Sequence, residues 1–195
     1  MSTGPLPLHA APAAGFDQPF EMLEACHERV QCRLRLLLRL AQHLRDRGPD
    51  ADAAQAARDV MRYFDIAGPA HHEDEERHLF PTLLTHGSAD AVAVVHRLQQ
   101  DHVCMSAQWP LVRGDLQEVV ALRWTPALGQ AAPLRWQEYA ALYESHIVIE
   151  ENQAYPAARP LFNAAAAQAM GHEMAQRRGA AGPSATPAAG APPAR

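Results

Sequence analysis

Helical periodicity is the feature of this sequence that most restricts its fold. Through residues 18–47, apolar residues recur at intervals of three and four, which places them on one face of a helix. This apolar stripe includes Phe20, Leu23, Val30, Leu34, Leu37 and Leu38. Residues 18–175 are rich in Leu, Ala, Arg, Glu and Gln, which favour helices, and show no alternating strand pattern. The sequence therefore predicts an all-α fold.

Four long helices are expected, separated by residues typical of turns. They cover residues 18–47, 51–84, 89–120 and 134–154, and a shorter helix is expected over residues 161–175. Gly68-Pro69 is expected to kink or briefly interrupt the second helix, and the fourth is expected to stop before Pro156. Because most connections between neighbours are short, the expected architecture is an antiparallel up-down-up-down four-helix bundle.

The chain has 195 residues, which suffices for one domain with a hydrophobic core. We expect that domain, a four-helix bundle, over residues 17–176. Residues 1–16 and 177–195 are expected to be disordered. The second of these segments is rich in Pro, Ala and Gly, a composition that cannot bury a core.

Composition argues against several classes of protein. The net charge of -5 disfavours non-specific binding to nucleic acid. No apolar run is long enough to cross a membrane, and the N-terminus lacks the basic and apolar regions of a signal peptide. The three cysteines form no CxxC pair, which favours a reducing compartment over a disulfide framework. A cytoplasmic protein is therefore expected.

One motif, H-x3-E-E-x3-aromatic-P, occurs twice, from His71 to Pro81 and from His146 to Pro156. A histidine and a glutamate four residues apart lie on the same face of a helix. They can therefore bind one metal ion together, or the glutamate can bridge two ions. A single copy is common as a solvated pair on a helix surface, but two copies with the same offset to an aromatic-Pro pair favour a metal site.

Two further histidines can complete such a site. His27 lies on the apolar stripe of the first helix, and His102 lies on the third helix among apolar residues. At about 1.5 Å of rise per residue, the distances along the chain to each turn bring these histidines to one level with the motifs. The predicted metal ligands are His27, His71, Glu75, His102, His146 and Glu150.

The register of the first motif has an alternative. His72 and Glu76 have the same spacing as His71 and Glu75. We prefer His71 and Glu75 because their distance to the proline matches that of the second motif. Asp74 is then expected to face water.

The segments "CHERV", "HHEDEERHLFP", "QQDHVCM" and "SHIVIEENQAYP" together resemble the hemerythrin-like, HHE cation-binding domains. The resemblance covers about residues 18–160. It implies a four-helix bundle that holds two iron ions in a non-haem centre, with histidine ligands and two bridging carboxylates. It also implies roles in binding or sensing oxygen, nitric oxide or redox state, or in handling iron.

The sequence departs from the family pattern in one respect, because a fifth histidine is not evident. Leu98 and Ser106 occupy the positions four residues before and after His102. His72, Glu73 or water can fill the place, and an open position would suit a small diatomic ligand. The departure equally allows a centre with only one ion.

Two other functions remain open. A di-iron oxidase or peroxidase would use the same ligands, although no substrate-recognition motif is visible, so binding is favoured over catalysis. A degenerate structural bundle without metal is the other alternative.

Overall fold

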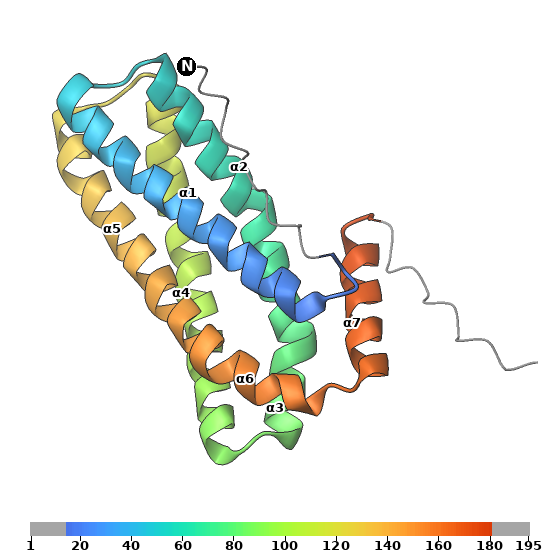
Figure 1. The fold of residues 1–195 in the computed structure, drawn as a ribbon. Helices are drawn as coiled ribbons and strands as arrows, with labels where there is room; N and C mark the ends of the chain where they lie inside the picture. Colours follow the sequence, from blue (N-terminus) through green and yellow to red (C-terminus); the bar gives the residue numbers. More distant parts are fainter. Residues whose placement is uncertain (1–14, 181–195) are drawn as a thin grey trace, which may run out of the picture.

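The protein is described by a computed structural model that covers residues 15–180. Its long helices are α1 (Pro19–Arg47), α2 (Ala51–Asp74), α4 (Ala89–Val120) and α5 (Pro126–Ile149). Each packs against two of the others, α1 against α2 and α5, and α4 likewise against α2 and α5, so that they enclose a common interior (Figure 1). Residues 15–180 contain no strand, which confirms the prediction of an all-α fold.

Local chemistry explains where these helices begin and end. The side chains of Asp50, Ser88 and Thr125 accept hydrogen bonds from backbone N–H groups in the first turns of α2, α4 and α5. Such caps satisfy donors that have no partner within the helix. Gly48 ends α1 with a φ of 76°, which side chains other than glycine rarely adopt.

Three expectations about prolines are wrong or incomplete. The α2 helix continues without a break through Pro69. The fourth long helix begins at Pro126 instead of residue 134. Proline is well suited to the first turn of a helix, because the backbone N–H groups there have no partner within the helix and proline lacks this group. It does not stop before Pro156 either, since the helical path continues into α6 (Tyr155–Ala158) and η3 (Arg159–Leu161).

Both copies of the repeated motif contain a π-helical turn. The turn η1 (Glu75–Leu79) links α2 to α3 (Phe80–His86), and η2 (Glu150–Ala154) links α5 to α6. In each copy the backbone N–H of the aromatic residue donates to the carbonyl of the first glutamate, five residues earlier. Such turns are rare and often occur at functional sites.

The buried apolar residues form two clusters along the bundle. One includes Val30, Phe64, Met105 and Trp136, and the other includes Leu23, Leu79, Leu98 and Tyr155. Along each long helix a buried histidine falls between these two clusters. The polar layer is thus closed on both sides by apolar side chains, which lowers the local dielectric and strengthens electrostatic interactions within it.

The last helix, α7 (Ala164–Arg177), packs against α1 outside the four long helices (Figure 1). Asp74, expected to face water, is fully buried and forms ion pairs with Arg177 and Arg178. The sequence pattern of α2 alone could not show that a later helix covers this face.

The helix α7 reaches one residue into the segment 177–195 that was expected to be disordered. Residues 1–14 and 181–195, most of the two predicted disordered segments, lie outside the described residues. Within residues 15–180, no helix combines the length and the hydropathy that crossing a membrane requires.

Candidate metal centre

The six predicted ligands lie together in the interior of the bundle, and none is more than 6% exposed. They come from six different elements: His27 from α1, His71 from α2, Glu75 from η1, His102 from α4, His146 from α5 and Glu150 from η2. Their ligand atoms form two groups of four, each within 4.8 Å, and both groups contain Glu75 and Glu150. The two glutamates are thus the common members of the whole layer.

The histidines divide into two pairs. The Nε2 atoms of His27 and His71 are 3.0 Å apart, and those of His102 and His146 are 3.1 Å apart. We call His27 and His71 the first half-site, and His102 and His146 the second half-site. Each pair points two imidazole nitrogens at one place, an arrangement suited to a shared metal ion.

Each carboxylate spans the two half-sites. One oxygen of Glu150 lies 3.1 Å from His27 Nε2, and the other lies 2.8 Å from His146 Nε2. The oxygens of Glu75 similarly approach His71 Nε2 at 3.6 Å and His102 Nε2 at 3.5 Å. Both carboxylates are therefore placed to bridge.

Several of these buried atoms have no hydrogen-bond partner among the described residues. They include both oxygens of Glu150 and one oxygen of Glu75. The groups nearest to the Glu150 oxygens are the imidazole nitrogens of His27 and His146, which form ion pairs with them when protonated. A buried carboxylate without a partner is costly, and a shared cation would satisfy it. Imidazole and carboxylate donors in this arrangement fit a centre of two transition-metal ions.

The second glutamate of each motif orients a histidine of another helix. His27 Nδ1–H donates to Glu151 at 2.9 Å, and His102 Nδ1–H donates to Glu76 at 3.0 Å. These bonds fix each ring so that Nε2 faces the interior, as is usual for histidines that bind metal. The role of Glu151 was missed, although the doubled glutamate in both copies of the motif was the signal for it.

The aromatic residue of each motif packs against one of the same two histidines. Tyr155 stacks on His27, with ring centroids 5.4 Å apart, and Phe80 stacks on His102 at 5.6 Å. The Tyr155 hydroxyl also donates to Glu75 at 2.5 Å. A place for Tyr155 at the site was not predicted, because in the sequence this residue served only to align the two motifs.

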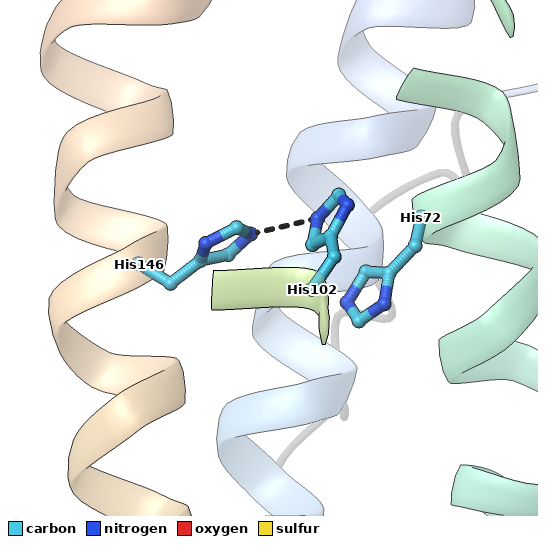
Figure 2. Close-up of side chains that lie close together, drawn as sticks. All are labelled: His72, His102 and His146. Carbon is cyan, nitrogen blue, oxygen red and sulfur yellow. Dashed lines mark hydrogen bonds between the residues drawn. The ribbon is translucent and has the colours of Figure 1, made fainter. Parts of the chain in front are cut away.

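His72 joins the second half-site. Its ring stacks on that of His102 with centroids 4.0 Å apart, and the two lie with His146 in a third group of ligand atoms within 4.8 Å (Figure 2). The Nε2 atom of His72 is buried without a hydrogen-bond partner. Glu73, the other candidate for this place, forms ion pairs with Arg77 and Arg177 instead.

Electrostatics differ between the histidines of the first half-site. Burial opposes the charged form of His27, but the carboxylates of Glu150, Glu75 and Glu151 prevail and raise its pKa to about 9. Burial lowers the pKa of His71 to about 3. Without metal, one imidazole of this pair therefore carries a positive charge that offsets part of the negative charge of the carboxylates.

Two comparisons relate this chain to known proteins. The family model described as the hemerythrin HHE cation binding domain matches residues 18–176. A protein of Haemophilus influenzae, named only as an uncharacterized protein, is 26% identical over 165 residues, which cover 85% of this chain and 92% of that protein. Because the family model matches most of the chain, the protein belongs to the hemerythrin HHE cation-binding domain family.

Proposed function

We propose that the protein binds two iron ions, one in each half-site, with Glu75 and Glu150 shared between them. The observation that carries the proposal is the pair of buried carboxylates, each placed between two sets of imidazoles and lacking hydrogen bonds to some or all of its oxygens. The family membership supports binding of a cation. Two observations support an up-down-up-down order for the bundle. Each long helix packs against two of the others, and short turns at Gly48 and Gly87 connect helices that are neighbours.

Iron is the metal that we propose because histidine and carboxylate ligands together suit a metal that changes oxidation state. When bound, iron supplies a redox-active centre that can take a diatomic ligand such as oxygen or nitric oxide. The chain contributes the geometry: Glu76 and Glu151 hold two imidazoles in place, and apolar clusters pack on both sides of the layer.

A degenerate bundle without metal is the less favoured alternative. Such a bundle would keep two buried carboxylates, with three of their four oxygens lacking a hydrogen bond, beside only the imidazoles and the Tyr155 hydroxyl. A di-iron oxidase is the second candidate function. One observation supports it, an aromatic pocket beside the second half-site.

The test is anaerobic reconstitution of the purified protein with ferrous iron. We expect about two ions per chain, an absorption change on adding oxygen or nitric oxide, and a higher melting temperature with metal than without, since metal binds only the folded state. Glu75→Ala and Glu150→Ala should lower iron content and melting temperature together.

The matched control is Glu28→Ala, because Glu28 is exposed on α1 next to His27. This variant should keep both its iron and its melting temperature. A wild-type protein that takes up no iron would overturn the proposal and leave the degenerate bundle.

A further inference from the structure

A pocket of about 390 Å³ lies beside the second half-site. It reaches the rings of His72 and His102, and its walls come from α2, α4 and α5. Aromatic side chains make up much of these walls: Phe64, Trp109, Tyr139 and Tyr143. None of these four is among the predicted ligands or the residues that orient them.

The pocket is larger than a diatomic ligand needs. A cavity of about 150 Å³ already holds benzene, and sites for small organic molecules begin at about 300 Å³. The volume of about 390 Å³ therefore fits an organic molecule with one or two rings. Its opening toward His72 and His102 places that molecule next to the second half-site.

The walls favour a flat and mostly apolar molecule. Trp109 and Tyr139 lie with centroids 5.8 Å apart and planes 29° apart, and Phe64 packs against both. Met105, which is buried, adds a polarisable side chain to the same lining. Such surfaces bind aromatic rings by stacking and by sulfur–aromatic contact.

One polar feature of the pocket is unsatisfied. The hydroxyls of Tyr139 and Tyr143 share one hydrogen bond of 3.4 Å, which uses only one of their two protons. The Tyr139 hydroxyl is the donor of this bond, and within residues 15–180 the Tyr143 hydroxyl accepts it without donating a hydrogen bond of its own. Both phenols are buried, and a phenol is protonated at neutral pH, so each carries a proton to donate. A ligand oxygen that accepts the Tyr143 proton would complete the pair.

Charge at the pocket argues against an anion. The carboxylates of Glu73 and Glu76 line it whereas no arginine does, so an anionic ligand would meet no guanidinium there. We propose that the pocket binds a small neutral aromatic molecule with one acceptor oxygen, such as an aryl carbonyl, beside the second half-site. The use of this molecule as a substrate would rest on the proposed iron centre, but its binding depends only on side chains of this chain.

The probes for a test are acetophenone, which is neutral with a carbonyl acceptor, ethylbenzene, which lacks the acceptor, and benzoate, which is anionic. Dissociation constants are measured by saturation-transfer NMR on the full chain, as purified and after metal removal. Acetophenone should bind to both forms and about tenfold more tightly than benzoate. Wild-type protein that binds none of the three probes at millimolar concentration would overturn the proposal.

Variants locate the site. The double variant Tyr139→Phe/Tyr143→Phe should weaken acetophenone about tenfold and leave ethylbenzene unchanged. The matched control is Tyr63→Phe, whose hydroxyl donates to the backbone carbonyl of Cys26 outside the pocket. It should change neither affinity. An equal loss in the control and the double variant would contradict the assignment.

If circular dichroism shows that the double variant does not fold, Ser106→Phe replaces it. Ser106 is exposed and lines the pocket, so a larger side chain there should block both neutral probes. Unchanged binding to this variant would overturn the proposal. Because the probes are tested without metal, a failure of iron uptake is recorded separately from a failure of the pocket.

Discussion

The two copies of the motif, residues 71–81 and 146–156, contribute to the centre in the same way. Each supplies a histidine, a shared glutamate and a π-helical turn. Each then uses its second glutamate and its aromatic residue to hold the histidine of a helix that has no motif. Four positions of a repeated sequence thus specify both the candidate ligands and their support.

The copies differ at two positions that matter for chemistry. His72 in the first copy corresponds to Ile147 in the second, and Phe80 corresponds to Tyr155. The second half-site consequently has a third imidazole and a pocket beside it, whereas the first half-site has a phenol that donates to Glu75. Small changes within a repeat therefore make the two halves chemically unequal.

The largest expected effect comes from removing this inequality at His72. The variant His72→Ile gives the first copy the residue of the second, and the second half-site then loses one of three imidazoles. We expect iron content after anaerobic reconstitution to fall from about two ions per chain toward about one. His96→Ile, at an exposed histidine of α4, is the control and should keep both ions. Full iron content in His72→Ile would show that His72 is not a ligand.

The next largest effect concerns the attachment of α7. In the described part of the chain, the ion pairs between this helix and the motifs involve the first copy and not the second. Asp74→Ala leaves Arg177 and Arg178 without their buried partner. Because both arginines are partly exposed, we expect a loss of about 2–3 kcal/mol in the free energy of unfolding. Urea denaturation measures it, with exposed Glu144→Gln as the control. A loss below about 0.5 kcal/mol would mean that this contact does not hold α7.

A smaller effect is expected from Tyr155→Phe, which gives the second copy the residue of the first. It removes the hydrogen bond from the phenol to Glu75, so the free energy of unfolding of the metal-free protein should fall by about 1 kcal/mol. The reverse change, Phe80→Tyr, should not restore that stability in the double variant, because Phe80 packs on His102 instead. Equal stability of wild type and Tyr155→Phe would show that the bond contributes nothing.

The smallest expected effect is a loss of folding stability at acid pH through the Glu173 carboxylate. Arg177 donates to Glu173 and, with His78, holds the pKa of Glu173 at about 2, below its ordinary value of 4.5. A lowered pKa stabilises the folded state fully above about pH 4.5, and this contribution disappears as the pH falls toward 2. The difference in stability between wild type and Glu173→Gln should therefore shrink over this range. A difference that is constant from pH 5 to pH 2.5 would contradict the assignment.

The sequence was sufficient to predict the helices and the convergence of six side chains, because both follow from helical period and rise. It offered His72 only as one of three candidates, with Glu73 and water, for the place of a fifth histidine. Adjacent residues of an α-helix point about 100° apart, and only the position of His102 on the neighbouring helix brings the second ring into the site.

The misplaced helix ends have a related cause. Proline rules describe a helix in isolation, whereas Pro69 and Pro156 lie in helical segments that packing maintains. The burial of Asp74 likewise depends on α7, which is distant in the sequence. Helical period and rise were enough to predict the level at which six side chains meet, whereas the burial of Asp74 and the placement of His72 depend on the packing of particular neighbouring helices.

The most direct test of the account is anomalous diffraction at the iron edge from crystals reconstituted with ferrous iron. We predict two peaks, one bordered by His27 and His71 and the other by His72, His102 and His146, about 3.5–4 Å apart as in bridged two-metal sites. The absence of any peak between the four long helices, or a single peak in one half-site, would contradict the claim of a centre shared by Glu75 and Glu150.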